Sequence, residues 1–396
     1  MWRSAAAVGV AAAMVAITPM TGSAQDRATG PVPVATPARA PALNVSVLEG
    51  GLSLPWDMAF LDRNRYLLTE RAGRIRLGNA ATGALSVVRA PLGDLALIDS
   101  GGLMGLAVDP SFGKNRLFYT CQTHKNPNDV RVVRWRLAAN GRSAVRVGAP
   151  LIQGIPFDRI HFGCRLLVMP GRTLLVGTGD GAIGSTPQDL DSLAGKILRV
   201  RLDGGVPANN PWATAAGPRR YVWNYGHRNI QGLALRPGTA QVFSAEHGPE
   251  WDDEVNRVLR KVNYGWDPVF PGGGPAYNQD VPMTDTSKFP AAQAAVWRSG
   301  ATTVATSGMD FVVGSAWGSY NGAAFVAKLK DMGVMALTFT AGGAVTGAAE
   351  VPELNDRYGR LRTIRRGPDG TIYVLTSNGG SADKILRVTP RTSGAG

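Results

Sequence analysis

Apolar and polar residues alternate along most of this chain, and turn residues break the alternation at regular intervals. A typical stretch, IQGLALRPGTAQVFSAEHGP from Ile230, has an apolar alternation, a Pro/Gly turn and a second strand-like run. Period-two alternation between turns predicts β-hairpins. The pattern occurs six times, with copies that begin at Pro55, Gly102, His161, Ile230, Thr306 and Leu361.

The six copies predict a repeat architecture. Units of roughly 40 to 50 residues that each form a small antiparallel sheet are typical of β-propellers. Radial stacking buries both faces of each sheet and leaves only short edges. We therefore predict an all-β fold, a six-bladed β-propeller of four-stranded antiparallel blades, as a single domain over residues 42–396. Longer spacing between the third, fourth and fifth copies predicts inserted loops, and Leu43–Leu48 is expected to add an outer strand that closes the ring.

The N-terminus has the features of a leader peptide. Arg3 gives a positive start, Ala5–Ile17 is apolar but short for a membrane span, and Gly22–Ala24 offers small residues for cleavage. We expect residues 1–24 to be a signal peptide, with an uncleaved anchor as the alternative, and the Pro/Ala-rich residues 25–41 to be a flexible lead-in. No later segment is apolar enough to span a bilayer. We therefore predict a periplasmic or secreted protein without stable membrane insertion.

Composition and charge exclude some partners. The 396 residues are 44% hydrophobic and 18% charged, which is enough for a large core, and the formal net charge is +13. The cations are mostly Arg at strand ends, with no basic run interleaved with aromatics, so a nucleic acid partner is not expected. An oxidising compartment permits a disulfide between the two cysteines, Cys121 and Cys164, but the sequence leaves their pairing open.

Polar residues stand just before several of the repeated strands. In a propeller the innermost strand of each blade begins beside the central channel, so these residues are expected to converge. They are His161, Arg228, Asn229, Arg360 and Arg362, with Lys330 near the strands of the fifth copy. Clustered cations repel one another, and Arg suits bidentate carboxylate recognition, so a small polyanion with carboxylates is the predicted ligand. The alternative for each cation is a local pair with a carbonyl or a surface acid.

His161 is the candidate for acid–base chemistry, because the ordinary pKa of histidine lies near neutral pH. Asp180 closes the hairpin that His161 opens, so we expect the two side chains to be neighbours, with the carboxylate orienting the imidazole. The alternative is a hydrogen-bonded histidine with a structural role.

A candidate cation site lies in EHGPEWDDEVN, which NYGWD follows a few residues later. Its closely spaced acids and the carbonyls beside Gly248 and Pro249 suit a hard cation such as Ca²⁺. The spacing differs from that of an EF-hand, and a solvated acidic loop is the alternative.

Together these motifs resemble the soluble glucose/aldose sugar dehydrogenases that use pyrroloquinoline quinone (PQQ) and Ca²⁺ on a six-bladed propeller. The resemblance runs from about residue 43 to residue 390. It is carried, in order, by LPWDMAFL, GGLMGLAVDPSF, HFGCRL with GTGD, GKILRV, YGHRNIQGLA, EHGPEWDDEVN with NYGW, SGM and GRLRTIRRGPDGTIYVLT.

The resemblance implies a reaction and roles for individual residues. An aldose would be oxidised at C1 to an aldonolactone by hydride transfer to PQQ, with His161 as general base and Asp180 as its orienting acid. Arg228 would stabilise charge developing on a quinone oxygen. The groups implied to bind PQQ oxygens and carboxylates are Asn229, Lys330, Arg360 and Arg362.

The resemblance also implies two Ca²⁺ sites and an unidentified electron acceptor, for which a quinone or a cytochrome would serve. Carbonyls of Gly248 and Pro249 would hold the active-site ion, while Glu254 and the Tyr264 carbonyl would hold a second, structural ion. Ser100 stands where the family often has Gln, and Ile160 where some members have Asp. These differences concern the sugar pocket.

Two other functions share the predicted fold. One is a Ca²⁺-dependent propeller lactonase or other hydrolase, which would need no ring of cations. The other is a non-catalytic exported propeller that binds a partner through its rim.

Overall fold

The computed structural model describes residues 40–270 and 277–391, and almost all of their regular structure is strand. The alternating runs found in the sequence form antiparallel sheets, each built from consecutive strands. The first three sheets contain β2 (Pro55–Phe60), β3 (Arg65–Glu70), β4 (Arg74–Asn79) and β5 (Leu85–Val88); β6 (Leu103–Val108), β7 (Leu117–His124), β8 (Asp129–Leu137), β9 (Ala144–Arg146) and β10 (Ile152–Ile155); and β11 (Gly163–Met169), β12 (Thr173–Thr178), β13 (Lys196–Arg201) and β14 (Val222–Tyr225).

The remaining three sheets follow the same plan. They contain β15 (Ile230–Leu235), β16 (Val242–Glu246), β17 (Glu254–Arg257) and β18 (Trp297–Arg298); β19 (Thr306–Phe311), β20 (Ala324–Lys328), β21 (Gly333–Phe339) and β22 (Val345–Glu350); and β23 (Leu361–Arg366), β24 (Ile372–Thr376), β25 (Asp383–Pro390) and β1 (Leu43–Leu52). The described helices are short: α1 (Phe112–Asn115), η1 (Pro218–Tyr221) and η2 (Ser315–Tyr320). None of them is long and apolar enough to cross a membrane.

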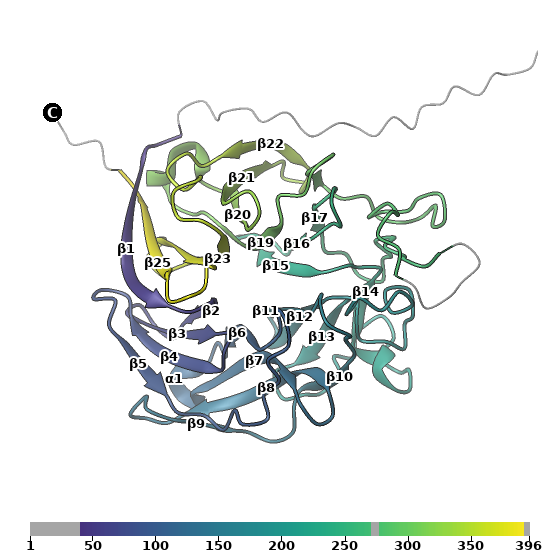
Figure 1. Ribbon diagram of the computed structural model, residues 1–396, viewed down its shortest axis with the longest axis horizontal. Coiled ribbons are helices and arrows are strands. Elements are labelled where there is room, and N and C mark those ends of the chain that lie inside the picture. Colours follow the sequence, from purple (N-terminus) through teal and green to yellow (C-terminus); the bar gives the residue numbers. More distant parts are fainter. Residues whose placement is uncertain (1–39, 271–276, 392–396) are drawn as a thin grey trace, which may run out of the picture. The chain divides into compact units, whose positions relative to one another are not determined.

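The six sheets form a closed ring. Their innermost strands are β2, β6, β11, β15, β19 and β23, and each contacts the next around the ring, with β23 returning to β2 (Figure 1). β1 pairs antiparallel with β25, from Leu43 opposite Pro390 to Leu52 opposite Asp383, so the start of the propeller completes its last blade. The predicted six-bladed β-propeller and its closing outer strand are confirmed. One blade departs from the four-stranded plan, because β9 adds a fifth strand beside β8.

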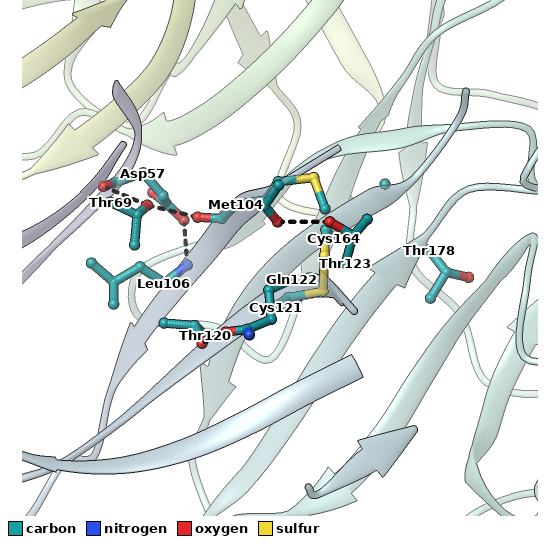
Figure 2. Close-up of a disulfide and its surroundings, with 12 residues drawn as sticks. Asp57, Thr69, Met104, Leu106, Thr120, Cys121, Gln122, Thr123, Cys164 and Thr178 are labelled. Atoms are coloured by element: carbon teal, nitrogen blue, oxygen red, sulfur yellow. Dashed lines mark hydrogen bonds between the residues drawn. A yellow bond between two sulfur atoms is a disulfide. The ribbon is translucent and has the colours of Figure 1, made fainter. Parts of the chain in front are cut away.

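Apolar residues between neighbouring sheets form the core, as radial stacking requires. The seam between the second and third blades is also cross-linked. Cys121 on β7 and Cys164 on β11 are fully buried and form a disulfide with a Cα–Cα distance of 5.4 Å (Figure 2). The pairing that the sequence left open is therefore present.

All six inner strands run in the same direction along the channel. We call the end where they begin the near mouth and the end where they finish the far mouth. The insertion predicted between the fourth and fifth copies is the long connection from β17 to β18, and it carries residues that reach the candidate site described below. The predicted signal peptide and most of the lead-in lie outside the described residues.

Candidate active site

A cavity of about 260 Å³ opens at the near mouth, and residues from five inner strands line it, Gly163 of β11 among them. Trp56 comes from β2, Met104 from β6, Gln231 from β15 and Arg362 from β23, while His161 stands just before β11. Of the residues predicted to converge, His161, Asn229, Arg360 and Arg362 line this one cavity. The expectation that strand beginnings from different blades meet in one pocket is thus fulfilled for these four.

His161 and Asp180 form a buried pair beside the cavity. Nδ1 of His161 lies 2.8 Å from Oδ1 of Asp180, and only 8% of the histidine side chain is exposed. Oδ1 also accepts the backbone N–H of Ala182, while Oδ2 accepts Nε1–H of Trp266 and the hydroxyl of Tyr277. Burial acts to raise the pKa of Asp180, but His161, Arg228 and Tyr277 hold it below its ordinary value. An ionised Asp180 fixes the proton of His161 on Nδ1 and leaves Nε2 with its lone pair.

The backbone at His161 is constrained as tightly as its side chain. His161 has φ +60°, a left-handed conformation that non-glycine residues seldom adopt. A Cβ on Gly179 would lie 1.8 Å from the carbonyl oxygen of His161, so only glycine allows the hairpin ends to come this close. Left-handed residues of this kind often mark functional sites, because the surrounding fold must hold them.

Arg228 is buried behind the cavity and is only partly satisfied. Its Nη1 donates to the carbonyl of His247 at 3.1 Å, its Nη2 donates to Oε1 of Gln279 at 2.6 Å, and the guanidinium lies 5.7 Å from the Trp266 ring. Arg228 Nε and His247 Nε2 are buried and have no hydrogen-bond partner among the described residues. Two unpartnered buried polar groups this close together need an explanation, and a bound polar ligand provides one.

A hydrogen-bonded chain links the other polar residues of the cavity. Oδ1 of Asn229 accepts the backbone N–H of Gly163 and Nε2–H of Gln231, while Oε1 of Gln231 accepts Nη1–H of Arg362 at 3.2 Å. Arg165, fully buried below, donates its Nε–H to the carbonyl of Gln231 at 2.7 Å. The side chains that would contact a ligand are thus fixed by their neighbours before it binds.

The cavity holds more positive than negative charge. Burial, together with nearby Arg165, Arg360 and Arg71, lowers the pKa of Arg362 to about 9. Burial and nearby Arg228 likewise hold the pKa of His247 well below its ordinary value, so this histidine is neutral. An environment that resists further positive charge favours an anionic ligand. Lys330 is a separate case, because its side chain is 56% exposed and lies 3.7 Å from Glu250.

The candidate residues of the active-site cation stand directly after His247. Gly248 and Pro249 are buried, and neither carbonyl accepts a hydrogen bond within the described part of the chain. A Cβ on Gly248 would lie 2.0 Å from the carbonyl oxygen of Trp251, so the turn requires glycine. Two free carbonyl oxygens in a tight turn fit a hard cation such as Ca²⁺.

Glu254 and Tyr264, assigned from the sequence to a second cation, lie deeper in the fourth blade. Oε1 of Glu254 accepts the Thr284 hydroxyl at 3.0 Å and lies 3.4 Å from Nη2 of Arg298, and Oε2 accepts the Asn256 amide. Arg298 thus already brings positive charge to this carboxylate, and the side chains fit a second metal less well than the turn at Gly248. Among the described residues no cluster of three or more His, Cys, Asp and Glu side chains is arranged to hold a metal. The second site stays a prediction.

The family model described as Glucose / Sorbosone dehydrogenase matches residues 52–387, most of the chain. The chain belongs to the glucose/sorbosone dehydrogenase family. The match confirms the resemblance drawn from the motifs and the predicted class of enzyme, a sugar dehydrogenase.

Relatives of this chain share both its sequence and its fold. The aldose sugar dehydrogenase YliI of Escherichia coli (strain K12) is 31% identical over 360 residues, which covers 89% of this chain and 94% of the relative. The crystal structure of the soluble aldose sugar dehydrogenase from Escherichia coli in the apo form superposes with a TM-score of 0.74 at 30% identity and covers 88% of this chain and 100% of that one. The PQQ-bound form of the aldose sugar dehydrogenase from Streptomyces coelicolor gives a TM-score of 0.70 at 27% identity and covers 89% and 99%.

The structure adds residues that sequence reasoning missed in this family member. Trp56 is the second residue of an inner strand and is not polar, so the rule that found His161, which concerns polar residues just before strands, did not include it. Gln231 is the second residue of β15 and stands two residues after Asn229, a spacing at which side chains of extended backbone share a face. Tyr277 and Gln279 lie in the long connection between β17 and β18, which has no periodic pattern, and nothing in the sequence pointed to them.

Proposed function

We propose that this chain is a PQQ- and Ca²⁺-dependent dehydrogenase that oxidises aldose sugars at C1 to aldonolactones. The observation that carries the proposal is a histidine–carboxylate pair beside a cavity that Arg360 and Arg362 line. Two buried nitrogens there, on His247 in the cavity wall and on Arg228 behind it, have no hydrogen-bond partner among the described residues. The names of the relatives support it, since the Escherichia coli relative is an aldose sugar dehydrogenase and the Streptomyces structure is a PQQ-bound form.

The residues of the near mouth fit a flat anion that carries several carboxylates. Arg228 Nε and His247 Nε2 offer polar contacts that protein atoms leave unused, and the lowered pKa of Arg362 is the mark of a site short of negative charge. The residues that would hold the oxygens and carboxylates of PQQ are Asn229, Lys330, Arg360 and Arg362. Lys330 would contribute only by leaving Glu250, since its side chain now points to that acid.

Bound PQQ would supply the acceptor for the hydride from C1, and Ca²⁺ held by the Gly248 and Pro249 carbonyls would supply a Lewis acid that polarises the quinone. Nε2 of His161 accepts the proton of the C1 hydroxyl, because Nδ1 is engaged with Asp180. Asp180 then stabilises the imidazolium across the same 2.8 Å contact. Loss of one proton and one hydride leaves C1 as the carbonyl carbon of the lactone.

Arg228 acts on the opposite side of the reaction in this proposal. Its guanidinium is already held by His247, Gln279 and Trp266, so it would stabilise charge on an oxygen of bound PQQ without having to reorganise. Ser100 and Ile160 line the same cavity on its outer side. They are the residues that we expect to shape the choice of sugar.

The proposal includes export and an external electron acceptor. The predicted leader peptide would carry the chain out of the cytoplasm, and the Cys121–Cys164 disulfide agrees with an oxidising compartment. A quinone or a cytochrome would serve as the acceptor that returns PQQ to its oxidised form.

The test is to reconstitute the apoprotein with PQQ and Ca²⁺ and to screen aldoses with an artificial electron acceptor. We expect sugar-dependent dye reduction, and a fall in kcat of about 10²- to 10⁴-fold in His161→Ala, the usual contribution of a general base. His124→Ala is the matched control, because His124 is also buried but pairs with Asp94 in the second blade.

Other results would point to the other functions. If no PQQ binds in an absorbance titration, a Ca²⁺-dependent hydrolase is favoured. If PQQ binds but no sugar reduces the dye, the chain is a non-catalytic propeller for these substrates. Wild-type turnover in His161→Ala would show that another group is the base.

A further inference from the structure

The connection between β17 and β18 brings two polar side chains onto the catalytic candidates. The hydroxyl of Tyr277 donates to Oδ2 of Asp180 at 2.5 Å and lies 3.3 Å from Nδ1 of His161. Two residues later, Oε1 of Gln279 accepts Nη2–H of Arg228 at 2.6 Å. The three-residue stretch 277–279 therefore contacts both the His161–Asp180 pair and Arg228.

Trp266, from the same connection, makes the same two links. Its Nε1–H donates to Oδ2 of Asp180 at 2.8 Å, and the Arg228 guanidinium lies over its ring. Trp266 is fully buried, so its position is set by packing. Oδ2 of Asp180 is therefore held by two neutral donors, Tyr277 and Trp266, while Oδ1 faces His161.

We propose that Tyr277 and Gln279 are positioning residues: Tyr277 fixes Asp180 and thereby sets the basicity of His161, and Gln279 fixes the orientation of Arg228. This inference rests on the proposed function, because it gives these residues their roles through His161 and Arg228. It extends the active site to the connection between β17 and β18, whereas the residues predicted from the sequence stand mostly just before inner strands.

The direction of the effect follows from charge. A neutral donor to Oδ2 draws negative charge away from the side of Asp180 that faces His161. Removing the Tyr277 hydroxyl concentrates charge on that side, which stabilises the imidazolium and raises the pKa of His161. The other charged or titratable groups around the pair are Arg228, Lys196, His247, Arg360 and Arg362. Tyr277→Phe changes none of these groups, so a shift in the pKa of His161 reports on the hydroxyl.

The pKa of His161 is measurable without cofactor. The chain has only four histidines, so NMR titration of histidine-labelled apoprotein resolves them, and His161→Gln assigns the signal. We expect Tyr277→Phe to raise the pKa of His161 by about half a unit, because only part of the energy of the hydrogen bond to Asp180 is passed on to His161. Trp266→Phe, which removes the other donor to Oδ2, should move it in the same direction.

Two controls make the measurement specific. Tyr221→Phe removes a tyrosine hydroxyl on η1 that makes no hydrogen bond within the described residues, and Gln279→Leu acts on Arg228 alone. Tyr221→Phe should leave the pKa of His161 unchanged, and Gln279→Leu should move it less than Tyr277→Phe does. An unchanged pKa in Tyr277→Phe, with the fold intact by circular dichroism, would overturn the role of Tyr277.

The reconstituted enzyme tests Gln279. Gln279→Leu should lower kcat about 10-fold, which is the size of a hydrogen bond to a charged group. Its PQQ affinity should change less than kcat, and the acid limb of its pH profile of kcat/KM should stay in place. In Tyr277→Phe the acid limb should move to higher pH. Wild-type kcat in Gln279→Leu would overturn its role. A wild-type enzyme that oxidises no sugar would defeat the proposed function instead, while the NMR result on Tyr277 would stand.

Discussion

The two ends of the propeller channel differ in size and in chemistry, and the smaller one is the candidate site. The far mouth holds a cavity of about 740 Å³, lined by the ends of inner strands, against about 260 Å³ at the near mouth. At the far mouth Arg365 pairs with Asp57, and Asp369 bonds to Thr371. At the near mouth the buried nitrogens of Arg228 and His247 are unpartnered. Unsatisfied polar groups therefore locate the site better than volume does.

A buried ion cluster lies between the two mouths. Asp57 on β2 is 2.9 Å from Nη1 of Arg165 and 2.8 Å from Nη2 of Arg365, and it also accepts the backbone N–H of Leu106. Asp57 and Arg165 lie partway along their strands, between the residues that line the near and far cavities, while Arg365 lines the far cavity itself. Two guanidiniums around one carboxylate leave a net positive charge below the near cavity. The cluster therefore serves both as a floor and as part of the field that attracts an anion.

Loss of Asp57 from this buried ion cluster should have the largest effect on stability. Asp57→Ala leaves two buried guanidinium groups without their carboxylate, and we expect the free energy of unfolding to fall by about 3–5 kcal/mol. Urea denaturation of the apoprotein measures it. Asp203→Ala, which breaks an exposed pair with Arg201, is the control and should cost at most about 1 kcal/mol. Equal effects of the two substitutions would mean that the buried cluster adds nothing special.

Loss of the disulfide should also destabilise the protein. It joins two blades, and one of its cysteines, Cys164, stands three residues after His161. The disulfide closes a loop with a sequence separation of 43, and we expect Cys121→Ser/Cys164→Ser to lower the free energy of unfolding by about 2–4 kcal/mol. Urea denaturation with and without reductant measures this loss. Reductant should lower the free energy of unfolding of the wild type to that of the double variant and should leave the value for the double variant unchanged. If reductant destabilises the variant too, the loss has another cause.

The near mouth was largely predictable because its geometry follows from one rule. Inner strands begin beside the channel, so polar residues that lead into them must meet, and this rule found His161, Asn229, Arg360 and Arg362. It did not place Lys330, which follows the second strand of its blade and lies against Glu250 at the surface. Position relative to an inner strand decides whether a side chain reaches the channel.

The remaining features depend on contacts between distant segments that no local pattern encodes. Tyr277 and Gln279, from the connection between β17 and β18, contact Asp180 and Arg228, which belong to the third blade and to the start of the fourth. The disulfide required the facing positions of two blades. The ring itself was predictable, because hydrophobic alternation specifies sheets and unburied sheet faces require stacking.

Two arginines on one strand allow the near and the far mouth to be compared directly as binding sites for PQQ. Arg362 and Arg366 both belong to β23, four residues and so about 13 Å apart, and they line the near and the far cavity respectively. If PQQ binds as proposed, Arg362→Ala should weaken its binding about 10- to 100-fold, because the variant would lack a charge-assisted hydrogen bond to a carboxylate. Arg366→Ala should change the affinity less than about twofold, since long-range charge effects are screened beyond a Debye length. Absorbance titration of apoprotein with PQQ at fixed Ca²⁺ measures both affinities.

The substitutions remove the same net charge from the same strand, so a difference in PQQ affinity between them reports the position of the charge. Equal weakening would mean that the anion responds to the general positive field of the protein, and the near mouth would lose its claim to be the binding site.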